Sequence, residues 1–193
     1  DEVQDLLDLA VQLKAAHAVQ GDGNLLAGKS LAMVFQKPSL RTRVSFERAM
    51  RHLGGNVLYI APDEIKLGVR ESVPDVARVL SRYVDIIMAR VFSHADVVDL
   101  AKWASVPVIN GLSDLCHPCQ GMADLLTIRE KLGRLAGVRL VYLGDGNNVT
   151  HSLLYAAAKT GIHLTVSTPQ GYDALPQVVA EAQRMAAETG ALI

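Results

Sequence analysis

Residues 31–43 read Leu-Ala-Met-Val-Phe-Gln-Lys-Pro-Ser-Leu-Arg-Thr-Arg, an apolar run followed by a polar loop. The apolar run 31–35 has the length and composition of a buried strand. After the loop, apolar residues return at helical spacing between Val44 and Leu53, so we expect a helix to begin near Ser39. A strand that leads through a short loop into a helix is typical of parallel α/β sheets.

The rest of the chain repeats this pattern. Short apolar runs follow at 57–60, 86–89, 106–109, 138–143 and 164–166, and stretches with helical periodicity separate most of them. Ser72, Ser93 and the pair His117-Pro118 mark further helix starts. Residues 1–19 have the spacing of an amphipathic helix that ends at the glycines of 21–24. The sequence therefore predicts an α/β fold with two parallel-sheet αβα domains joined by a helix.

We expect the boundary between the domains on the helix predicted for residues 118–132. Gly133 and Gly137 follow this helix, and a new strand-loop-helix-strand unit then begins. Only two clear strands follow before Ile193, and a two-stranded sheet covered by helices would leave much apolar surface in water. The predicted domains are therefore 1–123 and 137–193, with 124–136 as the linking helix and the second domain incomplete.

Composition excludes several classes of protein. The 193 residues are 50% apolar and carry a net charge of −1 with no long block of either sign, which argues against disorder and against a nucleic-acid surface. The longest apolar runs are far shorter than the roughly 18 residues of a membrane span. Residues 1–5 have no signal-peptide pattern, and both cysteines lie in one tetrapeptide, which favours a reducing compartment. We expect a soluble enzyme of the cytoplasm, or of the mitochondrial matrix in a eukaryote.

Two glycine-rich segments match nucleotide-binding patterns in an unsuitable context. Residues 23–30 match the phosphate-loop pattern, but a helix precedes them and a strand follows, so their amides would not converge on a phosphate. Residues 144–149 follow a strand, but Val149 replaces the third small residue of a dinucleotide loop, and no acidic residue ends the next strand. Asn147 and Asn148 either cap the following helix or contact a zwitterionic ligand.

The segment Cys116-His117-Pro118-Cys119 is open to three interpretations. Two cysteines at this spacing are typical of thiol-disulfide enzymes, in which a helix N-terminus lowers a thiol pKa. Such a motif normally follows an early strand of a small domain, whereas several strand-helix units precede this one. A zinc site would need two further ligands, and the segment offers only His117. Two inert thiols are the third interpretation.

The strongest chemical signal is Ser39-Leu40-Arg41-Thr42-Arg43 at the predicted helix start. Free backbone amides, the positive end of the helix dipole, two hydroxyl groups and an arginine would converge there on a dianion such as phosphate. Charge-assisted hydrogen bonds contribute about 1.5–3 kcal/mol each, so several can hold a small phosphorylated metabolite. The alternative is a capped helix without a ligand, and in either case we expect Arg43 to pair with Glu47.

Three more polar side chains follow the predicted ends of strands. Arg90 ends the strand that begins at Ile86, and His117 and Gln120 open the helix after the strand expected to end at Asn110. Ligands gather at the carboxyl edge of a parallel sheet, so these residues and the 39–43 loop are expected to share one crevice. The other histidines lack such neighbours and are interpreted as surface or capping residues: His17, His52, His94, His151 and His163.

Three motifs together resemble the aspartate/ornithine carbamoyltransferase family, and its ornithine branch most closely. The phosphate signature of that family, Ser-Thr-Arg-Thr-Arg, is similar to residues 39–43. Its His-Pro-x-Gln signature appears at 117–120, and Gly-Asp-Gly-Asn-Asn, which marks the ornithine branch, is complete at 144–148. The order and spacing of these motifs match across essentially the whole chain.

The resemblance implies transfer of the carbamoyl group of carbamoyl phosphate to the δ-amine of L-ornithine, giving citrulline and phosphate, without a metal or cofactor. The first domain would bind carbamoyl phosphate, the second would bind ornithine through Asn148, and Arg90 and His117 would be catalytic. The implied carbamoyl phosphate contacts are Ser39, Leu40, Arg41, Thr42, Lys66, Arg90, His117, Pro118, Cys119 and Gln120. A homotrimer or larger homo-oligomer is also implied, in which the 65–72 loop brings Lys66 to a neighbouring subunit.

The chain departs from the family pattern in three respects. Leu40 stands where threonine is usual, which removes one hydroxyl group but keeps the backbone amide. Lys66 stands where many members have glutamine or histidine. The Asp-x-x-x-Ser-Met-Gly and His-Cys-Leu-Pro loops of the family, which hold ornithine, do not occur before Ile193, so this chain alone is expected to be inactive. N-acetylornithine or putrescine as acceptor, a thiol-disulfide oxidoreductase and a non-catalytic phosphate-binding module are the alternatives.

Overall fold

The structure is a computed structural model that describes residues 2–193. These residues form two compact units. One unit is Leu13–Asp114, which we call the four-stranded unit, and the other combines the residues up to Gln12 with Leu115–Ile193, which we call the two-stranded unit. Helix α1 (Glu2–Gln20) contributes residues to both, and it ends before Gly21 as the sequence predicts.

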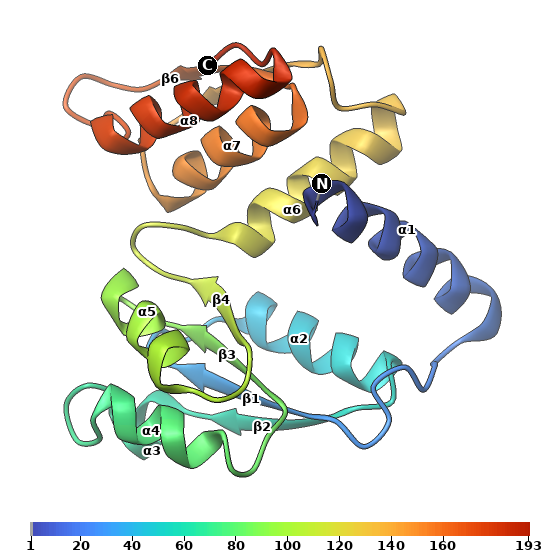
Figure 1. The fold of residues 1–193 in the computed structure, drawn as a ribbon, viewed down its shortest axis with the longest axis vertical. Coiled ribbons are helices and arrows are strands. Elements are labelled where there is room, and N and C mark those ends of the chain that lie inside the picture. The colour runs from blue at the N-terminus through green and yellow to red at the C-terminus, as the bar shows by residue number, and fades with distance from the viewer. Residues whose placement is uncertain (1) are drawn as a thin grey trace. The chain divides into compact units, whose positions relative to one another are not determined.

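The four-stranded unit contains a parallel sheet with the strand order β2-β1-β3-β4. Its strands are β1 (Ser30–Phe35), β2 (Asn56–Ile60), β3 (Ile86–Arg90) and β4 (Val108–Leu112). The helices α2 (Leu40–His52), α3 (Pro62–Ile65), α4 (Val73–Leu80) and α5 (His94–Trp103) connect successive strands (Figure 1). The carboxyl ends of the strands therefore lie at one edge of the sheet, where the connecting loops gather.

Strand β1 lies in the middle of this sheet and is buried on both faces. Leu31, Met33 and Phe35 pack with Met50 of α2 in one apolar cluster. Ala32 and Val34 belong to a second cluster on the opposite face, together with residues of α4 and α5. The alternation follows from the two-residue repeat of a strand, and the continuous apolar run 31–35 follows from helices on both faces.

Strand β4 begins and ends later than the predicted range 106–109. Pro107 has no N–H for a ladder hydrogen bond, although its carbonyl oxygen accepts from Ile87 N at 3.0 Å. The strand continues through Gly111 to Leu112 across a register shift at Ala89/Arg90. A side chain at position 111 would run into Met88, so glycine suits this close approach. The prediction that this strand ends at Asn110 is therefore wrong by two residues.

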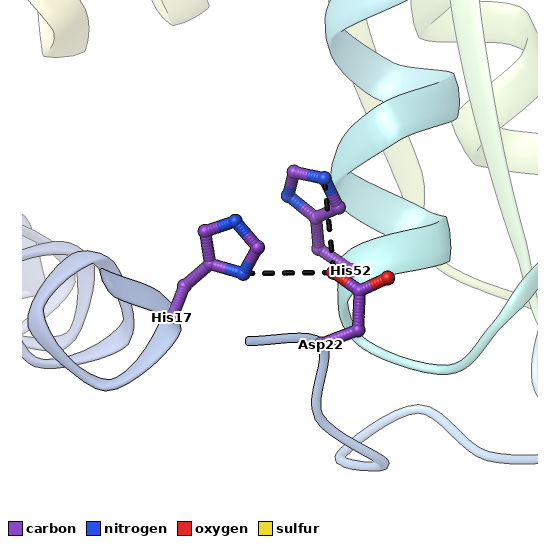
Figure 2. Close-up of side chains that lie close together, drawn as sticks. All are labelled: His17, Asp22 and His52. Atoms are coloured by element: carbon purple, nitrogen blue, oxygen red, sulfur yellow. Dashed lines mark ion pairs between the residues drawn. The ribbon is translucent and has the colours of Figure 1, made fainter. Parts of the chain in front are cut away.

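The end of α1 and the end of α2 meet in the four-stranded unit. The imidazole rings of His17 and His52 are stacked, with centroids 4.1 Å apart and planes inclined by 18°. Asp22 is in the loop after α1, and its Oδ1 lies 3.6 Å from His17 Nδ1 and 3.8 Å from His52 Nε2 (Figure 2). The cluster is at the surface, with 58% of the Asp22 side chain exposed.

The two-stranded unit contains β5 (Arg139–Leu143) and β6 (His163–Ser167), which pair in parallel. Its other helices are α6 (Pro118–Leu132), α7 (Asn148–Thr160) and α8 (Pro176–Thr189), and α7 packs against both α6 and α8. One core cluster holds these helices, Leu7 of α1 and the side chains of one sheet face. On the other face Val141 is 60% exposed and Leu143 is 75% exposed.

The α/β class and the parallel sheets predicted from the sequence are confirmed. The predicted helix starts are also found, because Ser72 and Ser93 are N-cap residues that accept backbone N–H groups, and Pro118 is the first residue of α6. Among residues 2–193, none of the helices combines the length and apolar character needed to cross a membrane.

Candidate functional site

The predicted phosphate loop lies between β1 and α2. Ser39 is the N-cap residue of α2, and its hydroxyl oxygen accepts a hydrogen bond from Thr42 N at 3.3 Å. The Ser39 hydroxyl in turn donates to Thr42 Oγ1 at 3.1 Å. The first N–H groups of a helix have no partner within it, and the first turn of α2 contains no acidic residue. This helix start is therefore suited to an anion.

Arg90, at the end of β3, contacts the same loop. Its Nη1 donates to Thr42 Oγ1 at 3.2 Å, and its Nε is buried without a hydrogen-bond partner among residues 2–193. Burial lowers the pKa of Arg90, and the positive charge of Arg41 lowers it further. A buried guanidinium N–H without a partner, next to a second positive charge, is unfavourable, and a bound anion would relieve both costs. This corner thus offers both the charge and the hydrogen-bond donor that a phosphate group needs.

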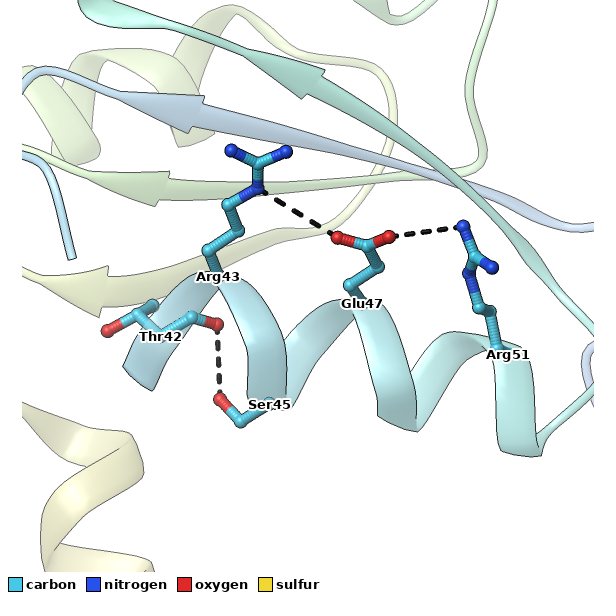
Figure 3. A network of polar contacts seen from close by, with 5 residues as sticks. All are labelled: Thr42, Arg43, Ser45, Glu47 and Arg51. Carbon is cyan, nitrogen blue, oxygen red and sulfur yellow. Dashed lines mark hydrogen bonds and ion pairs between the residues drawn. The ribbon is translucent and has the colours of Figure 1, made fainter. Parts of the chain in front are cut away.

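Arg43 points to different partners. Its Nε lies 3.9 Å from Glu47 Oε2, and its guanidinium group lies over the Tyr59 ring at 4.0 Å. Glu47 also pairs with Arg51 at 3.1 Å, so the two arginines share one carboxylate along α2 (Figure 3). The predicted pairing of Arg43 with Glu47 is confirmed, and it separates Arg43 from the group formed by Arg41, Thr42 and Arg90.

Gln36 supports this site although no motif includes it. Its side-chain amide donates to Asp96 Oδ2 at 2.8 Å and to Leu67 O at 3.1 Å. Its Oε1 accepts from Phe92 N at 2.8 Å, and the backbone N–H of Gln36 donates to Arg90 O at 2.9 Å. One side chain therefore ties the ends of β1 and β3 to α5 and to the 66–72 loop. The signal in the sequence is a polar residue directly after five buried ones.

Leu40 and Lys66 lie on the same unit and are exposed. Leu40 is the first residue of α2, and its side chain is 77% exposed. Lys66 ends α3 in the left-handed backbone conformation, with φ of 45°. It immediately precedes Leu67, whose carbonyl oxygen binds Gln36. The Gln36 side chain therefore links the loop of Lys66 to the strand end that precedes Ser39.

His117 lies in the two-stranded unit, at the start of α6. It is the N-cap residue, Pro118 follows at the first helical position, and the His117 N–H donates to Ser152 Oγ at 2.8 Å. Gln120 is exposed, and its Nε2 donates to Asp124 Oδ1 one turn along α6 at 2.9 Å. Proline suits this helix start, because the first N–H groups of a helix have no partner within it and proline, which lacks an N–H, therefore loses no hydrogen bond there.

The cysteines at this helix start are thiols rather than a disulfide. Burial raises the pKa of the Cys119 thiol. A thiol-disulfide enzyme needs the opposite shift, because the thiolate is the attacking species. The environment of Cys119 therefore argues against the redox interpretation of this segment.

The glycine-rich segment 144–148 leads into α7. Asn147 is the N-cap residue, and its Oδ1 accepts from Val149 N at 2.9 Å and from Thr150 N at 3.4 Å. Gly146 N donates to Tyr172 O, and a side chain at this glycine would overlap the backbone of Ala174. Of the two interpretations of this asparagine pair, helix capping therefore applies to Asn147. Asn148 is the first residue of α7, and its contact with a ligand stays a prediction.

The interpretation of His151 as a surface or capping residue is wrong. Its side chain is only 3% exposed, and its Nδ1 lies 2.8 Å from Leu115 O, while its Nε2 accepts from Leu175 N at 3.2 Å. Residues 150–154 of α7 are all buried because this helix packs between α6 and α8. A single histidine near the start of a predicted helix gives no sequence signal for such burial.

His17, Asp22 and His52 are a group whose ligand atoms lie within 4.8 Å of one another (Figure 2). Two features argue against a metal centre at this group. Stacked imidazole rings hold their nitrogen lone pairs in two separate planes, whereas ligands of one metal must converge on a point. In addition, Arg48 Nη2 lies 2.6 Å from His52 Nε2 and places a positive charge there. The group is best described as a surface polar cluster.

The predicted site residues thus fall on two units. The four-stranded unit holds Ser39, Leu40, Arg41, Thr42, Lys66 and Arg90. The two-stranded unit holds His117, Pro118, Cys119, Gln120 and Asn148. Within the first unit, Ser39, Thr42 and Arg90 are joined by hydrogen bonds. The shared crevice expected from the sequence stays a prediction.

Comparison with known families matches both parts of the chain. The family described as "Aspartate/ornithine carbamoyltransferase, carbamoyl-P binding domain" matches residues 1–130. The family described as "Aspartate/ornithine carbamoyltransferase, Asp/Orn binding domain" matches residues 136–193. Together the two matches cover nearly all of the sequence.

Individual relatives agree with these matches. The chain is 55% identical over 190 residues to an ornithine carbamoyltransferase of Pyrococcus abyssi, covering 98% of this chain and 60% of that protein. It is similar in structure to an ornithine carbamoyltransferase from Pyrococcus furiosus, with a TM-score of 0.97, 54% identity, and coverage of 99% and 61%. The corresponding protein from Thermus thermophilus gives a TM-score of 0.88 at 47% identity, with coverage of 99% and 63%. The chain therefore spans about 60% of the length of the curated relatives that it matches.

Proposed function

Because the chain belongs to the aspartate/ornithine carbamoyltransferase family, we propose that it is part of an enzyme that makes citrulline and phosphate from carbamoyl phosphate and L-ornithine. The observation that carries this proposal is the corner formed by Thr42, Arg41 and Arg90. There a buried guanidinium Nε, which has no hydrogen-bond partner within residues 2–193, lies beside a second cation and a helix start. In this proposal the phosphate of carbamoyl phosphate occupies that corner.

The phosphate binds to the start of α2. The backbone amides and side chains of Ser39, Leu40, Arg41 and Thr42 surround it, and Lys66 from a neighbouring subunit of a homotrimer adds a further cation. Leu40 contributes only its amide, because its side chain is apolar and 77% exposed. Charge-assisted hydrogen bonds of this kind contribute about 1.5–3 kcal/mol each.

The reaction is an attack of the uncharged δ-amine on the carbamoyl carbon. The new C–N bond forms while negative charge grows on the carbonyl oxygen, and the C–O bond to phosphate then breaks with the electron pair leaving on phosphate. The attacking nitrogen gives up one proton, which leaves with the phosphate as hydrogen phosphate. Arg90 bridges the phosphate and the carbonyl oxygen, and His117 donates a hydrogen bond to that oxygen. Donors placed where charge develops lower a barrier by about 2.7–4 kcal/mol each. Gln120, Pro118 and Cys119 line the carbamoyl group, and Asn148 contacts ornithine.

The proposal divides the chain by function. Residues 1–123 bind carbamoyl phosphate, residues 124–136, which include the second part of α6 (Pro118–Leu132), link the domains, and residues 137–193 belong to the ornithine-binding domain. The description of the second matching family, an Asp/Orn binding domain, supports this division.

The full-length protein that contains this chain provides the test. We expect citrulline to form from carbamoyl phosphate and ornithine, and we expect Arg41→Ala and His117→Ala each to lower kcat by about 100- to 1,000-fold. Arg43→Ala is the matched control, because Arg43 binds Glu47 and Tyr59 instead, and it should keep most of the activity. N-acetylornithine and putrescine should be tested as acceptors in parallel. No citrulline, or rates unchanged by Arg41→Ala and His117→Ala, would contradict the proposal.

A further inference from the structure

Two adjacent residues of α7 hold the segment that leads into His117. From their hydrogen bonds we infer that Ser152 and His151 are positioning residues, which set the place of His117 relative to Asn148. This inference rests on the proposed function, in which His117 contacts the carbamoyl oxygen and Asn148 contacts the amino-acid substrate. All of these residues lie within the two-stranded unit.

Ser152 connects the backbones of both proposed substrate contacts. Its Oγ accepts a hydrogen bond from His117 N at 2.8 Å and donates to Asn148 O at 3.0 Å. The side chain is buried, at 7% exposed. Because His117 is the N-cap residue of α6, the place of its backbone N–H determines where its imidazole begins. A single hydroxyl group therefore relates the two segments 115–120 and 147–152.

His151 fixes the same segment two residues earlier. A backbone N–H can only donate, so the contact with Leu175 N requires that His151 Nε2 accept. The proton of a neutral imidazole must then lie on Nδ1, which donates to Leu115 O at 2.8 Å. With both nitrogens satisfied and only 3% of the side chain exposed, this ring has one tautomer and one orientation.

Helix packing brings α6 and α7 together at Ser152. A Cβ atom added at Gly121 of α6 would lie 3.4 Å from Ser152 Cβ and 3.4 Å from Ser152 O. The start of α6 and the first turns of α7 are thus in close contact at Ser152. The Ser152 Cβ atom, which carries the hydroxyl group, is therefore held beside the start of α6.

The first experiment separates positioning from ordinary stabilisation. Ser81 makes the same two kinds of hydrogen bond in the other unit, donating to Ala77 O at 2.7 Å and accepting from Ser105 N at 3.0 Å. In the full-length enzyme we expect Ser152→Ala to lower kcat by about 10- to 100-fold, with a change in KM for carbamoyl phosphate of less than about threefold. Ser81→Ala should lose comparable stability and keep the wild-type kcat.

The second experiment uses the two ends of the His151 ring. Asparagine can place an amide nitrogen near the position of Nδ1, and glutamine can place a carbonyl oxygen near the position of Nε2. His151→Asn should therefore keep the hydrogen bond to Leu115 O and retain kcat, whereas His151→Gln should keep only the contact with Leu175 N and lose kcat by about 10-fold or more.

The outcomes distinguish this inference from the proposed function. A wild-type kcat in Ser152→Ala, an equal loss of kcat in Ser81→Ala, or equal effects of His151→Asn and His151→Gln would each overturn the positioning role while citrulline synthesis stands. Absence of citrulline from the wild-type enzyme would overturn the proposed function and the positioning role with it.

Discussion

In the four-stranded unit helices cover both faces of the sheet, whereas in the two-stranded unit they cover one face. Every residue from Leu31 to Phe35 of β1 is buried. In β5 burial alternates, so that Leu140 and Tyr142 pack against the core while Val141 and Leu143 remain exposed. The two strands have similar apolar sequences, and the number of covered faces makes the difference between them.

The comparison extends to the proposed site. In the four-stranded unit the ends of β1 and β3 bring Thr42 and Arg90 together, so the sheet itself supplies the geometry. In the two-stranded unit His117 follows no strand of the same sheet, and side chains of α7 hold its segment instead. The proposed site residues of the four-stranded unit therefore depend on strand pairing, and those of the two-stranded unit depend on helix packing.

The largest expected difference between the units is in the free energy of unfolding that is lost when a strand side chain is truncated to alanine. Ile87 in β3 is fully buried, so Ile87→Ala should lower the free energy of unfolding by about 2–5 kcal/mol. Val141 in β5 is 60% exposed, so Val141→Ala should cost about 0.5 kcal/mol or less. Urea denaturation measures both, with Trp103 fluorescence reporting on the four-stranded unit and far-UV circular dichroism on the whole chain. Equal losses would break the comparison, because they would mean that the exposed face of β5 is covered in solution.

Removing a helix cap should lower the free energy of unfolding by a smaller amount, and by the same amount in the two units. Ser72 caps α4 by accepting from Asp75 N at 3.3 Å, and Asn147 caps α7 by accepting from two backbone N–H groups. Ser72→Ala and Asn147→Ala should each lower the free energy of unfolding by about 1 kcal/mol, because a cap acts on its own helix whatever covers the sheet. The same urea experiment measures the loss in free energy of unfolding, with Ser72→Thr and Asn147→Asp as controls that keep an acceptor; threonine also keeps the hydroxyl donor to Asp75. A change near zero in either alanine variant would show that its cap is not formed in solution.

The comparison also explains what the sequence could predict. Apolar runs and capping residues are local, so the strands, the helix starts and the parallel class follow from them. Pro107 and Gly111 changed the limits of β4, because the register shift beside Met88 depends on the neighbouring strand. Burial of His151 depends on how α7 lies between α6 and α8, which no local pattern encodes.

For the site, the motifs indicated which residues to consider but not what holds them. The loop at Ser39 could be predicted from the sequence, because a helix start has a local signature. The roles of Gln36 and Ser152 could not be predicted, because each side chain joins segments that are distant in the sequence. Side chains that bridge distant segments can be recognised only once the fold is known.

The smallest expected effects come from one surface ion pair in each unit. The hydrogen bond from Lys29 lowers the pKa of Asp85, and the Ser30 N–H lowers it further. The hydrogen bond from Arg129 similarly lowers the pKa of Asp8. A carboxyl group with a lowered pKa in the folded state stabilises the protein above its unfolded pKa of about 4, and this contribution is lost as the pH falls through the lowered value. Both pairs are at the surface, so salt should screen them.

Asp85→Asn and Asp8→Asn should therefore lower the Tm at neutral pH by less than either cap variant does. The difference from the wild type should shrink as the pH falls below about 4, and it should also shrink in about 1 M salt, where the screening length is about 3 Å. We expect the larger change for Asp85→Asn, because the second donor to Asp85 is the backbone N–H of Ser30 at 2.8 Å, whereas the second donor to Asp8 is the exposed side chain of Gln4 at 3.2 Å. Thermal unfolding at several pH values measures these differences. A loss that persists unchanged at low pH would mean that the aspartate side chain stabilises its unit through packing rather than through its charge.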